Sequence, residues 1–285
     1  MHFFNFDFSA VQVIWTLTFA ALLVLLVVLL GRDRMRRFPW FTASIVLMTL
    51  DMLGKRLLHG RLPQLTFAGI FIAIADLVVL VGLLVVVEMA RSAFAGMRRR
   101  NWIIGALLML AVGAGVLYAW GPWPDWKTLT ANSQLAVLEL MQLGAQKGEL
   151  LVSVLTVEIG LLIVLFGRHF KAGWRSHTQQ IVIGLSTAAI AQLAFQGIQQ
   201  IIVKTAVIHT QAELDQAREL LRRLFNASGS VYVAVLLWWI VCLWNDEPGA
   251  VVAVEAPAEI PVADAVVETA EEPAAAPIEE EKSEL

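Results

Sequence analysis

Long apolar stretches separated by short polar loops occupy most of the chain. Each stretch is about 20 residues, the length that an α-helix needs to cross about 30 Å of hydrocarbon. Six are clear from hydropathy, while the seventh carries Asp51, Lys55 and Arg56 in its second half. The pattern predicts an all-α fold, a polytopic bundle of seven transmembrane helices. The predicted spans are 9–30, 38–58, 66–90, 102–120, 133–167, 177–204 and 227–245.

Two of the predicted outer segments are more than connectors. The segment 133–167 contains no proline, so we expect one helix of about 50 Å that begins outside the membrane and continues through the fifth span. Thr210 and Glu213 have the spacing of a capping box, and 210–225 has one apolar face. This second segment predicts a short amphipathic outer helix. The pattern leaves open whether the two pieces form a small outer cap or lie on the lipid headgroups.

Arginine and lysine are densest in three short loops, which follow the first, third and fifth spans. Because such residues favour the cytoplasmic side, the N-terminus is expected outside and the C-terminus inside. This arrangement predicts a multi-pass protein of the cell membrane, the inner membrane in a bacterium. At the inner end of the third span, Glu88 and Arg91 are three residues apart and predict an interfacial ion pair.

Composition supports a membrane protein and excludes several other classes. Apolar residues make up 58% of the chain and charged residues 16%, with a mean hydropathy of +0.71. A cytosolic enzyme, a secreted disulfide scaffold and a free nucleic-acid-binding protein fit these values poorly. Cys242 is the single cysteine, so no intramolecular disulfide forms.

Charge divides the chain into two parts. Residues 1–245 carry 20 Lys and Arg against 12 Asp and Glu, whereas residues 246–285 carry 1 against 12. The second part combines Pro, Ala, Val and Glu without any apolar period. We therefore predict a seven-helix transmembrane domain over 1–247 and a disordered acidic cytoplasmic tail over 248–285. A protein partner, if there is one, is expected at this tail or at the outer cap.

Four glutamines form the clearest polar stripe within a span. Gln192, Gln196, Gln199 and Gln200 recur at helical spacing and share one face of the sixth span. Amides are costly in lipid, so this face is expected to contact protein, water or a polar ligand. Two alternatives remain open: a hydrogen-bonded seam with another helix, and the lining of a polar cavity.

Ionisable side chains add to this set in the second and third spans. Asp51 and Lys55 are one turn apart and can pair along the helix, and Lys55 can also reach the outer headgroups. Asp76 lies near the middle of the third span, where an unpaired carboxylate is costly. Its expected partners are Lys55 or Arg56.

In the fifth span, Glu149 and Ser153 share a stripe, while Glu158 points the opposite way and needs a different partner. If the second, third, fifth and sixth spans face a common centre, these side chains form one polar site in the outer half of the bundle. The candidate residues are Gln192, Gln196, Gln199, Gln200, Asp51, Lys55, Asp76, Glu149 and Ser153.

Motifs for several chemistries are absent from the sequence. It has no His-Glu-x-x-His, Walker A, Gly-x-Gly-x-x-Gly or Gly-x-Ser-x-Gly motif, and no mid-membrane pair of histidines for haem. The seventh span has no lysine to hold retinal. We therefore assign no catalytic residue, no cofactor and no metal, and we expect no nucleic-acid partner.

Three phrases carry a resemblance: 59–64 (HGRLPQ), 146–149 (QKGE) and 170–177 (FKAGWRSH). They resemble an uncharacterised family of bacterial multi-pass membrane proteins, over residues 1 to about 248. The resemblance implies a membrane bundle but no activity. The layout is also similar to the membrane sensor part of some histidine kinases, although no kinase or receiver domain follows the seventh span.

These features favour a non-enzymatic sensor, adaptor or accessory subunit that acts through partners. The alternative is a carrier or channel for a small polar solute or protons that uses the Gln, Asp and Glu side chains of the core. A lipid-modifying enzyme is the third class, and no catalytic pair supports it.

Overall fold

The computed structural model describes residues 10–58, 60–93, 99–120, 123, 134–166, 176–205 and 211–246. The regular structure of these residues is entirely helical, with seven α-helices, one short 3-10 helix and no strand. The chain divides into two units, Met1–Pro248 and Gly249–Leu285. The predicted disordered tail and His59 lie outside the described residues. The elements are α1 (Ala10–Gly31), η1 (Arg34–Arg36), α2 (Pro39–Leu58), α3 (Gln64–Ala93), α4 (Arg99–Ala119), α6 (Gln134–Phe166), α7 (His177–Thr205) and α8 (Gln211–Trp244).

Proline and glycine set several helix boundaries. Pro39 is the first residue of α2, a position where its missing N–H costs nothing because that group has no partner within the helix. Gly60 has a φ of 77° in the short connection between α2 and α3, a conformation that residues with a Cβ rarely adopt. Asp33 also has a positive φ, 52°, where the chain leaves α1 for η1. These turns make α1, α2 and α3 antiparallel neighbours.

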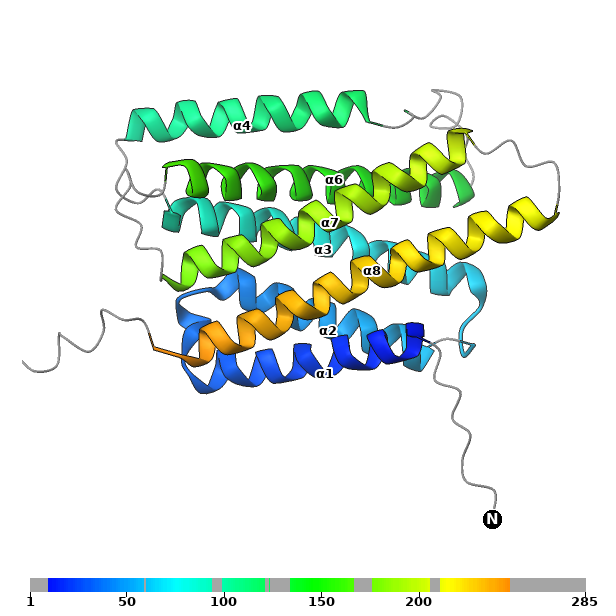
Figure 1. The fold of residues 1–285 in the computed structure, drawn as a ribbon, viewed down its shortest axis with the longest axis horizontal. Helices are drawn as coiled ribbons and strands as arrows, with labels where there is room; N and C mark the ends of the chain where they lie inside the picture. The colour runs from blue at the N-terminus through cyan, green and yellow to red at the C-terminus, as the bar shows by residue number, and fades with distance from the viewer. Residues whose placement is uncertain are drawn as a thin grey trace, which may run out of the picture. The chain divides into compact units, whose positions relative to one another are not determined.

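Helix contacts close a ring in the order α1, α2, α3, α6, α7 and α8, and α8 returns to α1. A contact between α3 and α7 crosses this ring, while α4 packs on the outside against α6. Figure 1 shows α4 at one edge of the bundle and α7 and α8 crossing in front of the others. The ring therefore gives α2, α3, α6, α7 and α8 an inward face.

Five helices are long and apolar enough to cross a membrane: those within Ala10–Gly31, Gln64–Ser92, Ala136–Leu165, His177–Ile202 and Glu213–Trp244. Large apolar side chains such as Val27, Leu108 and Leu165 remain more than half exposed on the outside of the bundle. Soluble monomers rarely expose so much apolar surface. The chain thus has the length, composition and surface of a membrane protein. Two further helices, α2 with its three charges and α4 with the shorter apolar stretch Ile103–Ala119, fall outside the five.

The buried apolar core lies toward one end of the bundle, which we call the core end and define by Gly31, Pro39, His177 and Trp244. Trp239 of α8 is only 1% exposed and meets the ring of Phe41 edge to face, with centroids 5.1 Å apart. The cluster also takes Leu25, Met89, Ile159 and Ile181 from α1, α3, α6 and α7. Six helices therefore meet at the core end, whereas the candidate polar residues belong to the other half.

The structure corrects the prediction of a separate outer helix over 210–225. Gln211–Trp244 is one continuous helix, so this amphipathic segment is the first part of α8. The expected boundary at residue 226 does not form: Ser230 donates to the Asn226 carbonyl within the helix, and Gly229 packs closely on Ile14 of α1. By contrast, the structure has the single long helix expected over 133–167, which is α6.

Glu88 has a different role from the expected ion pair with Arg91. Its two carboxylate oxygens accept the backbone N–H groups of Trp40 and Phe41, at 3.2 and 2.9 Å. These N–H groups belong to the first turn of α2, where no carbonyl of the same helix can accept them. Glu88 of α3 therefore caps the N-terminal end of α2. Because Glu88 is far from Trp40 and Phe41 in the sequence, local residue spacing cannot reveal this contact.

Candidate functional site

Asp51 and Lys55 of α2 form an ion pair, with Nζ 2.6 Å from Oδ2. The Asp51 side chain is 19% exposed and the Lys55 side chain 56% exposed. The Lys55 ammonium also lies 5.8 Å from the centroid of the Phe71 ring on α3. The second helix therefore presents a partly exposed cation held between a carboxylate and an aromatic face.

Glu149 of α6 is the second acidic group of this region. Its Oε1 accepts a hydrogen bond of 3.1 Å from the Gln192 amide of α7. We call two contacts the polar network: the Asp51–Lys55 ion pair within α2 and the Gln192–Glu149 hydrogen bond between α7 and α6.

The glutamine stripe of α7 faces the inside of the ring. The most exposed apolar side chains of α7 include Ile190, Ile198 and Ile201, which lie about 120–180° around the helix from Gln192. Glu149 remains exposed although it faces α7. Part of the polar network is therefore accessible at the surface of the described structure.

The remaining glutamines follow Gln192 along α7 toward its C-terminal end. Gln196 and Gln200 are half-buried, while Gln199 is exposed. Ser153 is buried at 8% exposure, one turn beyond Glu149 on α6. These residues extend the stripe on either side of the network.

Asp76 is not part of the polar network. Its Oδ1 lies against Gly144 of α6, 3.7 Å from where a Cβ would be. Gly144 and Glu149 are five residues apart, which puts them about 140° apart around α6. The expected partners have other contacts, since Lys55 pairs with Asp51 and Arg56 lies over the ring of Trp15. The common centre expected for all the candidates therefore excludes Asp76.

Glu158 is a second carboxylate away from the network. Both of its oxygens are buried, and neither has a hydrogen-bond partner within the described part of the chain. Nearby on the opposite face of α6, Ser186 of α7 donates to the Thr156 carbonyl at 2.9 Å and crosses the helix interface where Gly160 provides room. The α6–α7 seam is thus held by one buried hydrogen bond and by the contact between Glu149 and Gln192.

A group of contacts at the core end was not evident from the sequence. Arg34 Nη2 lies 3.0 Å from Asp246 Oδ1, and Arg32 lies 3.5 Å from the same carboxylate. His177 donates through Nε2 to the Asn245 carbonyl at 3.0 Å. Because more than 200 residues separate Arg34 from Asp246, no local pattern could indicate this contact. It fixes the end of α8, from which the acidic segment continues.

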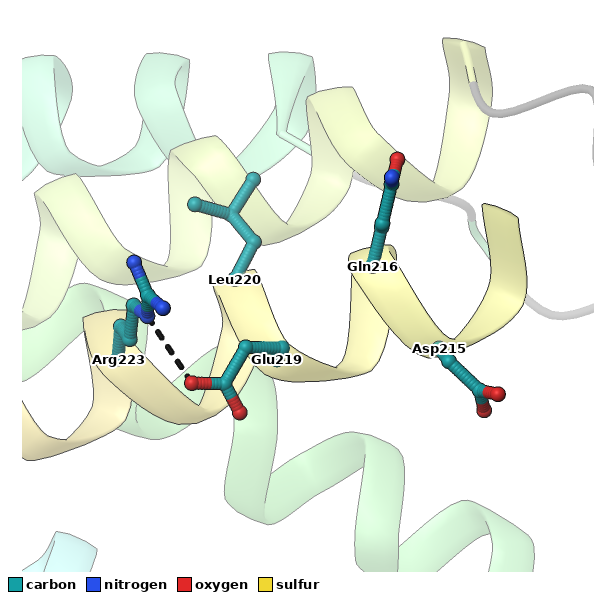
Figure 2. Close-up of a pocket in the computed structure, with 5 residues that line it drawn as sticks. All are labelled: Asp215, Gln216, Glu219, Leu220 and Arg223. Carbon is teal, nitrogen blue, oxygen red and sulfur yellow. Dashed lines mark hydrogen bonds and ion pairs between the residues drawn. The ribbon is translucent and has the colours of Figure 1, made fainter. Parts of the chain in front are cut away.

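A hollow of about 540 Å³ lies on the first part of α8 and is lined by Asp215, Gln216, Glu219, Leu220 and Arg223 (Figure 2). All five residues belong to one helix. Glu219 pairs with Arg223 at 3.0 Å and also with Arg222, so its charge is already balanced. This hollow is an open helix surface with internal ion pairs, and it offers no convergent groups for chemistry.

Within the described ranges, no three His, Cys, Asp or Glu side chains are arranged to hold a metal ion. Comparison with protein families, curated proteins and solved structures finds no match to this chain.

Proposed function

We propose that the chain is a seven-span integral protein of the cell membrane, with α2 and α4 crossing beside the five long apolar helices. The ring of helix contacts supports this count, because α2 packs between α1 and α3 and α4 packs along α6. The Asp51–Lys55 ion pair lowers the cost of carrying both charges within a span. An outer N-terminus and a cytoplasmic acidic tail complete this arrangement.

We further propose that the protein is a non-enzymatic sensor, adaptor or accessory subunit whose bundle binds a small polar solute. The polar network carries this proposal. It places partly exposed charged and amide groups on three helices, so a solute that bridges its two contacts changes how α2, α6 and α7 interact. Six helices meet at the core end, close to the start of the acidic segment. A partner that binds at this end would therefore contact helices whose packing has changed.

Thermal unfolding of the purified full-length protein tests solute binding. The probes are glycine, acetamide, sodium acetate and ethanolamine hydrochloride, at equal ionic strength. At least one probe is expected to raise the unfolding midpoint. Gln192→Leu should weaken that response roughly tenfold or more, because a hydrogen bond to a charged group contributes about 1.5–3 kcal/mol.

The matched control is Gln216→Leu. Gln216 is an exposed glutamine on the first part of α8 and does not belong to the polar network. It should leave the response unchanged. If no probe shifts the midpoint, or if both variants respond as the unchanged protein does, solute binding at the polar network is wrong.

A carrier or channel is the second candidate function, and one observation favours it. Gln196 and Gln199 continue the stripe from Gln192 toward the end of α7, as a polar path would require. Removal of residues 249–285 separates the two functions. A carrier keeps solute uptake into vesicles after this truncation, whereas an adaptor that works through the acidic tail loses its partner in a pull-down.

A further inference from the structure

Glu158 of α6 is a carboxyl group inside the bundle whose oxygens have no partner. Both oxygens are buried, and within the described residues neither takes part in a hydrogen bond. An ionised carboxylate in this position is costly, because neither water nor a cation balances its charge. Glu158 therefore needs either a cation or a proton.

The face of α6 that packs against α4 includes Glu158. Four residues follow one another on this face at spacings of four, four and three: Lys147, Leu151, Leu155 and Glu158. The Lys147 ammonium donates to the carbonyl of Trp120, directly after α4. Leu151 lies against Gly113 of α4, 3.0 Å from where a Cβ would be. Glu158 thus belongs to the seam between α4 and α6.

These two contacts also set the register of the seam. Because Lys147 lies opposite Trp120 and Leu151 lies opposite Gly113, the two helices are antiparallel. Continued in this register, Glu158 comes to the level of Leu108 on α4. The surrounding stretch, 103–112, consists of apolar residues and one glycine. At this level α4 offers no polar side chain to the carboxyl group.

The other charged groups around Glu158 have different positions. On α6 itself, Lys147 is three turns away and Glu149 lies on the opposite face. On α3, Glu88 accepts the first N–H groups of α2, and Arg91 is exposed. The helix α7 has no charged residue over 178–203. Among the described side chains, none is placed to pair with Glu158.

A proton suits this seam better than another cation does. It binds one carboxyl oxygen and needs no further ligand, whereas a metal ion needs several oxygen ligands. Arg99 and Arg100 belong to the first turn of α4, about two turns from the level of Glu158, and their side chains lie outside the described residues. Pairing with either arginine is one outcome of the test below.

We propose that Glu158 is a proton-binding site and that its protonated form holds the N-terminal half of α4 against α6. When the carboxyl O–H bond breaks and the proton passes to water, the charge that remains draws water into the seam and separates this half of α4. The other end of α4 stays attached through Lys147. This inference is independent of solute binding at the polar network, since Glu149 lies on the opposite face of α6.

Infrared spectra of the full-length protein in lipid vesicles test the protonation. Near neutral pH, the carbonyl band of a protonated carboxyl group is expected. Glu158→Gln should remove this band. The matched control Glu139→Gln, which changes an exposed carboxylate near the start of the same helix, should leave it.

Spin labels on exposed residues test the movement of α4, in a Cys242→Ser background. One pair, Leu107→Cys and Leu161→Cys, reports the half of the seam that contains Glu158, and a second pair, Ala119→Cys and Gln146→Cys, reports the end near Lys147. Between about pH 5 and about pH 9, a range that covers the values known for buried carboxyl groups, a longer distance should appear in the first pair only.

Glu158→Gln should keep the short distance in the first pair at every pH. If this variant does not fold, Glu158→Leu replaces it, because an apolar side chain also removes the charge. The absence of a band that depends on Glu158 overturns the proton site and points to pairing with Arg99 or Arg100. A distance that changes equally with and without Glu158, or in both pairs, overturns its control of α4.

Discussion

At the scale of single residues, the absence of a side chain at Gly184 of α7 leaves room for the buried indole of Trp239. A Cβ at Gly184 would overlap this buried ring. Gly184→Ala should therefore destabilise the protein by about 1–3 kcal/mol, as overpacking of a filled core does. The control Gly115→Ala on α4 meets no atom within 4 Å and should be neutral or slightly stabilising. Chemical unfolding in detergent measures both, and equal effects would contradict this role of Gly184.

At the scale of elements, α2 depends on α3 for its first turn. Glu88→Ala removes the acceptor for two N–H groups, and the expected loss is about 1–2 kcal/mol of stability. Glu88→Gln keeps one oxygen and should lose less. The free energy of unfolding, measured with helical circular dichroism, ranks the two variants. Equal losses in the two variants would show that the charge of Glu88, which both variants remove, and not acceptance of the N–H groups, stabilises α2.

At the scale of the whole molecule, the contact between Arg34 and Asp246 puts the loop after α1 and the end of α8 at the same end of the bundle, which is the cytoplasmic end in the proposed orientation. In a Cys242→Ser background, cysteines at Asp33 and at Gly249 should both be protected from an impermeant maleimide in intact cells. A cysteine at Arg61, between α2 and α3, should be labelled. Labelling of Asp33Cys and Arg61Cys from the same side would contradict a spanning α2.

The sequence predicted the elements better than it predicted their contacts. Hydropathy located four of the five long apolar helices, α1, α3, α6 and α7, within a few residues of their bounds in the structure, because one helix crosses hydrocarbon only if about 20 successive residues are apolar. It misplaced the boundary before α8. The polarity of 210–225 suggested a separate helix, but neither Asn226 nor Gly229 ends a helix that packs on α1.

The candidate site shows the same limit at the level of side chains. Helical spacing correctly placed Asp51 and Lys55 on one face of α2, since the two residues are one turn apart. Spacing gave Asp76 a partner on α2, whereas its carboxylate lies against Gly144 of α6. Which face of a helix meets which neighbour depends on the order of helices around the ring, and no local pattern encodes that order.

The sequence by itself determined that the chain is helical and apolar enough for a membrane, because backbone groups in hydrocarbon must be satisfied within each segment. It also determined which residues share a helix face. Only the tertiary structure decided that Gln192 donates to Glu149, that Glu88 caps α2, and that Arg34 binds Asp246. These contacts join residues 43 to 212 positions apart, and they form only when packing fixes the order and rotation of the helices.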